Sequence, residues 1–436
     1  MAARRLIAVL TASAAVGCAT APAAHAASRG GTGVPVPMPY VVALNADEAS
    51  APAVTRRLET ELRISATGRF RASFRGFAAT LSTTQVDRLR SDPSVSWVVS
   101  DATVKTTVQK GAVAPERMPV GVARTGGIAS ASQTSADAAV AVLDTGIDLA
   151  NTDLDVRPGV NCVRSGRTPQ DDNGHGTHVA GTIGARAGNG ASIGVAPGTP
   201  VYAVKVLDNN AEGRLSTLLC GIEWVKLNAA RLNIRVANVS LTAAGSDDGR
   251  CGAVSQSPVH AAICSSVAAG ILYVAAAGNS GVDFSGTVPA AYREVLAVSA
   301  VTDTDGTAGG SGPSACASGE RDDTPATYSN FGRTLEAAAH LLAGPGTCVA
   351  SSAVGGGVVN MTGTSMAAPH VTGAAVRCRS TAGRAGPCAG MTPAQIIARL
   401  KYDAAVAASE GLGFAGDPLS GLAGIHRGHL VSTRRL

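Results

Sequence analysis

Five short apolar runs, separated by stretches of helical character, constrain the fold more than any other feature of this sequence. The runs are rich in Val, Ala and Leu and do not alternate with polar residues, which is typical of parallel strands covered on both faces. We therefore predict an α/β fold with a doubly wound, mainly parallel sheet, whose functional site lies at the carboxyl ends of strands. The strands are expected at 138–143, 201–207, 236–241, 271–276 and 295–300, and the helices at 176–185, 216–230, 257–269, 365–377 and 392–400.

A smaller unit precedes this region. Strand patterns at 40–44, 74–81 and 95–99 and helical patterns at 53–62 and 82–89, the second with Ser82 as N-cap, predict a small α+β module of the β-α-β-β-α-β kind over residues 38–101. Residues 102–118 are polar and without periodicity, as an exposed, cleavable linker would be. The large domain is expected over residues 119–420, followed by a C-terminal tail at 421–436.

The first residues have the pattern of an export signal. Arg4 and Arg5 precede an apolar run over residues 6–16, and small residues around Ala26 suit a signal peptidase. We predict a signal peptide at 1–26, a linker at 27–37 and a secreted protein; a lipid anchor through Cys18 is the alternative. No later segment suits a membrane helix, and the net charge of +5 forms no basic cluster, so neither a membrane nor a nucleic acid is an expected partner.

The cysteine count agrees with export. Of nine cysteines, removal of Cys18 leaves eight, an even number that predicts up to four disulfides in an oxidising compartment. No His/Cys spacing suits zinc, and no cofactor is expected to be required. The simplest pairing joins neighbours in the sequence: Cys251 with Cys264, Cys378 with Cys388, Cys316 with Cys348, and Cys162 with Cys220.

Three segments carry residues suited to chemistry. Asp144 ends an apolar strand, where a carboxylate is costly to bury without a partner. His175 lies between two glycines at the start of a helix, whereas the neighbouring His178 is expected to be structural. Ser365 begins a helix in which Pro369 breaks the usual rule, a feature that favours a functional site over a simple N-cap.

Together these segments resemble the subtilisin-like serine proteases (subtilases). Asp-Thr-Gly at Asp144, His-Gly-Thr-His-Val-Ala-Gly-Thr at His175 and Gly-Thr-Ser-Met-Ala-Ala-Pro-His around Ser365 match the three motifs of that family, and the resemblance covers nearly all of residues 36–415. It implies that Ser365 is the nucleophile, His175 the general base and acid, and Asp144 the residue that orients the imidazole. It further implies that Asn279, in Ala-Ala-Gly-Asn-Ser-Gly, binds the oxyanion.

The resemblance also implies a zymogen. The module at 38–101 would be an inhibitory propeptide, an intramolecular inhibitor removed by self-cleavage within about residues 102–118. The expected substrates are proteins or peptides, cleaved by an enzyme that acts as a monomer. The substrate-binding residues would be Ser240, Leu241, Thr242, Ala276, Ala277 and Gly278.

Two departures limit what the resemblance implies for specificity and metal binding. The family usually has two glycines after Ser-Leu, and here Thr242 and Ala243 follow, so added side chains would narrow the cleft; the default expectation is broad, apolar-leaning cleavage. Asp171 and Asp172 are expected to be solvated loop charges. Structural calcium near the glycine-rich residues 187–192 is a weak expectation because that segment has no carboxylate.

The sequence argues against two other functions. A lipase or esterase would need Gly-x-Ser-x-Gly around the nucleophile and the order Ser, Asp, His along the chain, and Ser365 has neither. An inactive, protease-like binding scaffold is the remaining alternative, against which the intact motif residues argue.

Overall fold

The structure is a computed structural model of the 436-residue chain, and it describes residues 36–111, 118–126, 138–186, 192–381, 384–419, 421 and 423–436. The predicted signal peptide, Cys18 and most of the 27–37 linker lie outside these residues, as do 112–117 of the expected cleavable linker. Within the described part, no helix has the length and apolarity needed to cross a membrane.

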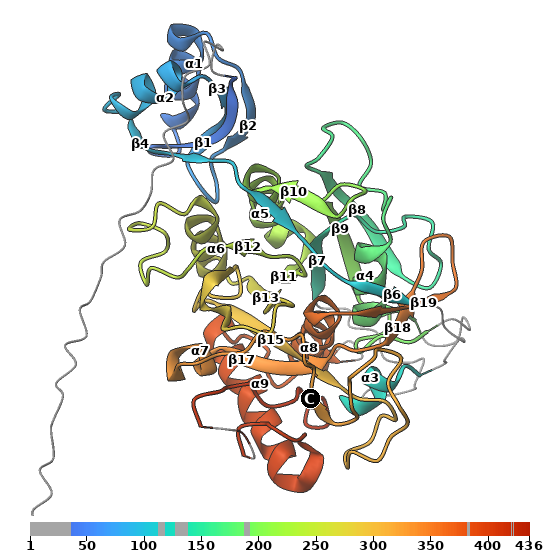
Figure 1. Ribbon diagram of the computed structural model, residues 1–436. Coiled ribbons are helices and arrows are strands. Elements are labelled where there is room, and N and C mark those ends of the chain that lie inside the picture. The colour runs from blue at the N-terminus through green and yellow to red at the C-terminus, as the bar shows by residue number, and fades with distance from the viewer. Residues whose placement is uncertain are drawn as a thin grey trace, which may run out of the picture. The chain divides into compact units, whose positions relative to one another are not determined.

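An eight-stranded sheet forms the centre of the large domain (Figure 1). Its order is β16-β15-β13-β11-β7-β9-β8, with β17 also paired to β15, and every pairing except that of β16 is parallel. This confirms the predicted α/β fold with a mainly parallel sheet. The strands are β7 (Ala139–Asp144), β8 (Asp155–Asn161), β9 (Pro200–Lys205), β11 (Ile234–Val239), β13 (Leu272–Ala276), β15 (Val295–Thr302), β16 (Thr324–Pro325) and β17 (Leu341–Pro345).

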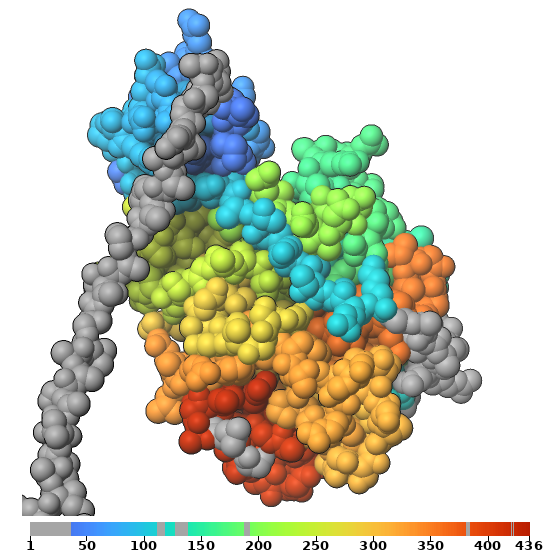
Figure 2. All heavy atoms as spheres, viewed as in Figure 1, coloured from blue at the N-terminus to red at the C-terminus, as the bar shows by residue number. Residues whose placement is uncertain are grey.

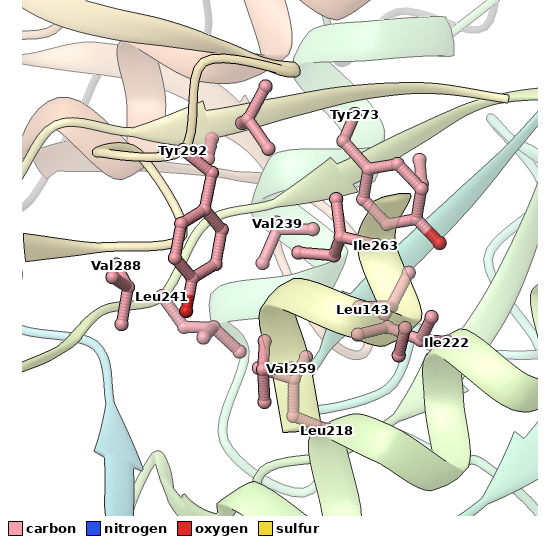
Figure 3. Packing of buried hydrophobic residues seen from close by; sticks show 14 of the residues in the cluster. Leu143, Leu218, Ile222, Val239, Leu241, Val259, Ile263, Tyr273, Val288 and Tyr292 are labelled. Carbon is pink, nitrogen blue, oxygen red and sulfur yellow. The ribbon is translucent and has the colours of Figure 1, made fainter. Parts of the chain in front are cut away.

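Helices cover both faces of this sheet, and alternation along each strand divides the apolar side chains between two cores. On β7, Ala141 and Leu143 belong to a core shared with α5 (Leu215–Leu232) and α6 (Pro258–Ala268), part of which Figure 3 shows. Val140 and Val142 belong to the opposite core, shared with the remaining large helices. These are α4 (His175–Gly184), α8 (Thr364–Arg379) and α9 (Pro393–Ala407).

The N-terminal module is a four-stranded antiparallel sheet with two helices. Its strand order is β2-β3-β1-β4, and a capping box between Ser82 and Gln85 begins the second helix. Val42 and Leu44 of β1 pack under the module's own helices, whereas Val41 and Ala43 join the core of α5 and α6. The elements are β1 (Met38–Leu44), α1 (Ala51–Leu62), β2 (Ala66–Phe70), β3 (Gly76–Leu81), α2 (Thr83–Arg90) and β4 (Val95–Ser100).

Short elements complete the described structure. The strands are β5 (Thr103–Lys105), β6 (Gln109–Gly111), β10 (Glu212–Arg214), β12 (Ala243–Ala244), β14 (Thr287–Val288), β18 (Val349–Ser352), β19 (Val358–Thr362), β20 (Ser380–Thr381) and β21 (Arg384–Ala385). The helices are α3 (Val120–Arg124), α7 (Leu335–Ala339), a 3-10 turn at Phe284–Gly286 and a π-helical turn at Ala408–Leu412. In the expected C-terminal tail, Leu430 pairs with Ala343 and Val431 is buried.

Four disulfides link the large domain. They join Cys162 to Cys220, Cys251 to Cys264, Cys316 to Cys348, and Cys378 to Cys388. These are the pairs that the nearest-neighbour rule predicts. Each closes a loop and restricts the unfolded chain, an effect worth about 2–4 kcal/mol per bond.

Candidate active site

The carboxylate of Asp144 and the imidazole of His175 meet at the carboxyl end of the central strand β7. Asp144 Oδ1 lies 2.7 Å from His175 Nδ1, and both side chains are 0% exposed. The backbone N–H of Thr145 also donates to Asp144 Oδ1, at 2.7 Å. A buried carboxylate on this side of the ring favours the tautomer with its proton on Nδ1, which leaves Nε2 as an acceptor.

A second carboxylate, that of Asp171, holds the start of α4 against the end of β7. Its Oδ1 accepts from the Thr145 hydroxyl at 2.9 Å and from the Gly174 N–H at 2.9 Å, and its Oδ2 accepts from the N–H and hydroxyl of Thr177. The expectation of a solvated Asp171 is wrong, since the residue is 3% exposed. The sequence does not reveal that Asp171 is buried, because its hydrogen-bond partners lie in two separate segments, at Thr145 and at 174–177.

Asp172 is the more exposed of the two acidic neighbours, and its side chain retains 52% of its accessible surface. It still pairs with the buried Lys205, whose ammonium lies 2.6 Å from Asp172 Oδ1 and donates to the Thr145 carbonyl at 2.6 Å. Lys205 and Asp171 therefore both hold Thr145 in the loop that follows Asp144, Lys205 through its carbonyl and Asp171 through its hydroxyl.

Ser365 is the second residue of α8, a helix buried along nearly its whole length, with Pro369 inside it as predicted. The Ser365 hydroxyl donates to the Ser240 carbonyl at 3.1 Å, and the Ser240 hydroxyl donates to the Ser365 carbonyl at 2.9 Å. The hydroxyl of Thr106 lies between Ser365 and His175, with its oxygen 3.1 Å from Ser365 Oγ and 3.1 Å from His175 Nε2.

Asn279 follows β13, and its amide group lies against Thr364, the residue before Ser365. The backbone N–H and the hydroxyl of Thr364 both donate to Asn279 Oδ1, each at 2.8 Å, which fixes which way the amide faces. Its Nδ2 donates to the Thr107 carbonyl at 2.7 Å. A donor held in this way can stabilise negative charge that develops on a carbonyl oxygen.

The segment before residue 112 runs through the site as an extended chain, drawn in cyan in Figure 2. Its β5 pairs antiparallel with β10, and Lys105 and Thr242 exchange two backbone hydrogen bonds of 3.0 and 2.9 Å. Further along, β6 pairs antiparallel with β19. Residues 103–111 of the expected linker are thus bound by main-chain hydrogen bonds, and Val104 is fully buried in the core of α5 and α6.

The residues predicted to contact substrate lie at two neighbouring strand ends. Ser240 and Thr242 contact Ser365 and Lys105 as described, and Leu241 belongs to the same core as Val104. Ala276, Ala277 and Gly278 are buried where β13 ends. Beside the Thr107 carbonyl lies a cavity of about 180 Å³, lined by Thr107, Val108, Gln109, Asn279, Tyr328 and Thr362.

Among the described residues, three groups of His, Cys, Asp and Glu side chains bring possible metal-ligand atoms together, and His178 belongs to none of them. Burial lowers the pKa of His178 to about 3, and its Nε2 lies 2.8 Å from the Val349 carbonyl, so it is structural as predicted. In the described chain, Asp303, Asp305 and Asp322 bring carboxylates together. The Arg124 guanidinium lies 2.6 Å from Asp303 and 2.8 Å from Asp323, so one of the three carboxylates already pairs with a cation of the protein. Residues 187–191, where calcium was considered, lie outside the described residues.

Comparison with family models gives two matches in adjoining regions. The model described as "Subtilase family" matches residues 135–416, and the model described as "Peptidase inhibitor I9" matches residues 40–107. The second match extends past the module's last strand and ends at Thr107, the residue whose carbonyl faces Asn279.

Curated relatives and a solved structure agree. The chain is 36% identical to "Alkaline protease" of Alkalihalobacillus alcalophilus over 68% of its own length and 66% of that protein, so it spans about two thirds of that relative. It is 36% identical to "Subtilisin E" of Bacillus subtilis (strain 168) over 68% of each chain. A crystal structure of a cold-adapted subtilisin-like serine proteinase shares the fold, with a TM-score of 0.53 and 24% identity over 73% of this chain and 99% of that one.

Proposed function

This chain belongs to the subtilase family, and on that premise we propose that it is a secreted serine endopeptidase made as a precursor that cuts itself. In this proposal Ser365 is the nucleophile, His175 the general base and then acid, Asp144 the residue that orients the imidazole, and Asn279 an oxyanion donor. The observation that carries it is the 2.7 Å contact between Asn279 Nδ2 and the Thr107 carbonyl, which lies on a strand bound next to Ser365.

The proposed reaction forms an acyl-enzyme. Ser365 Oγ attacks the carbonyl carbon while its proton passes to His175 Nε2. The C–N bond then breaks as His175 gives that proton to the leaving nitrogen. Water, deprotonated by His175, hydrolyses the ester and releases Ser365. The short contact of His175 Nδ1 to the buried Asp144 supports this role, because it favours an imidazolium during the transfer.

The first substrate in this proposal is the protein's own chain, cut between Thr107 and Val108. Thr107 has its carbonyl at the Asn279 amide, and Lys105, two residues earlier, is fixed by its pair of bonds to Thr242. The match to the inhibitor family ends at the same residue, 107. Both observations support a single scissile bond inside the 102–118 segment.

After the cut, the module would remain as an inhibitor because its contacts do not depend on the broken bond. The buried carboxylate of Glu223 on α5 accepts from the N–H groups of Arg71, Ala72 and Ser73 and from the Ser73 hydroxyl, at 2.6–3.0 Å. Hydrogen bonds to a charged group contribute about 1.5–3 kcal/mol each, so this cluster is a large part of the proposed affinity.

A second contact holds the module at the first turn of α5. Asp101 accepts from the N–H and the hydroxyl of Ser216, at 2.8 and 2.7 Å. A carboxylate in this position satisfies free N–H groups and complements the positive end of the helix dipole.

For substrate preference we propose broad cleavage of extended peptides with an apolar residue three positions before the one at the cut. Val104 has this position in the bound strand and is fully buried. Ala276, Ala277 and Gly278 would line a neutral pocket for the residue at the cut, and no carboxylate among the predicted substrate-binding residues demands a basic side chain.

The test combines labelling with mass spectrometry. We expect a fluorophosphonate to label the processed protein, labelling to be lost in Ser365→Ala, and the control Ser280→Ala, at an exposed serine beside Asn279, to keep it. The processed chain is expected to begin at Val108. A correctly folded, processed protein that takes no label would favour the inactive scaffold instead. Recovery of the protein from the medium of the expressing cells, cut after Ala26, tests secretion.

A further inference from the structure

The hydroxyl of Thr106 contacts both Ser365 and His175. Its oxygen lies 3.1 Å from His175 Nε2 and 3.1 Å from Ser365 Oγ. Thr106 belongs to the bound strand, between Lys105, fixed to Thr242, and Thr107, fixed to Asn279. The backbone on both sides of Thr106 is therefore held, and its side chain lies next to Ser365 and His175.

Counting protons shows what this contact does. With the Nδ1 proton on the Asp144 side, His175 Nε2 accepts one hydrogen, and the Thr106 hydroxyl has one to give. The Ser365 hydroxyl has an acceptor of its own in the Ser240 carbonyl at 3.1 Å. In this arrangement the Ser365 proton does not face the imidazole, and no hydrogen lies between the Thr106 and Ser365 hydroxyl oxygens, which are 3.1 Å apart.

General-base catalysis needs the base within hydrogen-bond reach, about 2.6–3.2 Å, of the atom whose proton it removes, or one water away. We propose that Thr106 is a brake on self-cleavage: it takes the acceptor position of His175, so that Ser365 is activated only when the Thr106 side chain rotates away. The proposal rests on the proposed function. The brake leaves with the module after the cut between Thr107 and Val108, so it acts on the precursor and not on the mature enzyme.

The same geometry has an opposite interpretation, which the test must separate. Thr106 could relay the proton, receiving it from Ser365 while giving its own to His175. A relay needs the hydroxyl, so its removal would slow the cut, whereas removal of a brake speeds it. The Ser365 hydroxyl has two acceptors at 3.1 Å, the Ser240 carbonyl and the Thr106 oxygen; its proton faces the carbonyl under the brake and Thr106 under the relay.

The experiment measures the rate of self-cleavage of the refolded precursor. Thr106→Val keeps the shape and removes the hydroxyl, and we expect it to cut about 3- to 10-fold faster, the range for one hydrogen bond. Thr106→Ser restores the hydroxyl and should stay within about 2-fold of the original rate. Thr84→Val is the matched control, since Thr84 is exposed on α2 of the module, and its rate should not change.

A Thr106→Val rate equal to or below that of the unaltered precursor overturns the brake, and a slower rate identifies the relay. If Thr106→Val does not refold, Thr106→Ala gives the same comparison with the same two outcomes. Mature enzyme from every variant begins at Val108 and should have identical kcat/KM on a peptide substrate. Failure of the proposed function looks different: no precursor would cut, and no folded protein would react with a fluorophosphonate.

Discussion

The two sheets of this molecule differ in how they are covered. The central sheet of the large domain has its own helices on both faces, so Ala141 and Val142 of β7 enter different cores of the same domain. The module's sheet has its own helices on one face alone, and Val41 and Ala43 on its other face pack into the core of α5 and α6. A unit of about 65 residues gains little stability by itself. The module therefore needs the large domain to cover one face of its sheet, whereas the central sheet of the large domain is covered by its own helices.

This difference suggests separate roles for the two regions in catalysis and in inhibition. The large domain holds every proposed catalytic group, while the module offers a complementary apolar face and the segment that fills the cleft. The following predictions test that division, beginning with the largest expected effect.

Ser365→Ala should leave the two regions joined. Without the nucleophile we expect self-cleavage to fall by about 10⁶-fold, the scale for loss of a triad serine, so that the precursor stays intact. Gel electrophoresis and intact-mass measurement after refolding check this. Normal maturation of the purified variant would show that another protease makes the cut.

Asn279→Ala should weaken the chemistry in both settings, on the protein's own strand and on added peptides. Loss of one oxyanion donor typically lowers kcat by about 10²–10³-fold with little change in KM. Steady-state kinetics of the processed protein measure this, with Asn210→Ala, at an exposed asparagine, as the control. A change confined to KM would contradict the proposed role.

Glu223→Ala should loosen the module without touching the catalytic groups. Four donors of the module lose their acceptor, and we expect release of the cut module to be about 10- to 100-fold faster. Glu223→Gln, which keeps the volume, should give an intermediate rate. The return of peptidase activity after self-cleavage is the readout, and an unchanged rate would mean that the apolar face alone holds the module.

Mild acid should destabilise the large domain, and the module with it. Burial lowers the pKa of His178 to about 3 and that of His370 to about 4, so the unfolded chain binds more protons below about pH 6.5. The contribution of these two histidines is full above pH 6.5 and falls by about 1.4 kcal/mol per pH unit for each as the pH drops. Asp303, whose pKa is raised by burial to about 7, opposes one of them over the same range. The module at 38–101 contains no histidine.

The chain's two tryptophans separate these responses, since Trp97 lies in the module and Trp224 in the large domain. In the Ser365→Ala precursor we expect the urea midpoint seen through Trp224, in a Trp97→Phe variant, to fall between pH 7 and pH 5. The midpoint seen through Trp97, in a Trp224→Phe variant, should fall with it, because the module depends on the large domain for part of its core. A Trp97 midpoint that holds steady would show that the module is stable without the large domain.

The sequence predicted the main elements because their patterns are local. All five long helices of the large domain lie at their expected places, although α9 runs to Ala407, well beyond the expected end at 400. Among the strands that the sequence did not predict, three have identifiable reasons. The strand β8 is a half-exposed edge that contains Pro158, β17 contains Gly344 and ends at Pro345, and β2 is a short strand with Gly68 at its centre.

The site was predictable only where a motif names the residue. Asp171 could not be recognised as buried, because its hydrogen-bond partners are supplied by two separate segments, at Thr145 and Thr177. Thr106 carries no motif, and its importance arises from the bonds that hold Lys105 and Thr107 on either side. Such roles come from tertiary contacts, which single-sequence patterns do not encode.

The four disulfides make the large domain more resistant to proteolysis than the module. All of them lie between Cys162 and Cys388, and residues 38–107 contain no cysteine. Proteolysis of a folded chain proceeds through its opened states, and cross-links make such states rarer in the segments that they close. A protease that attacks both regions equally would therefore digest the module, which has no disulfide, faster than the cross-linked large domain. When mature molecules of this protein meet at high concentration, they would degrade the inhibitor and leave the free enzyme.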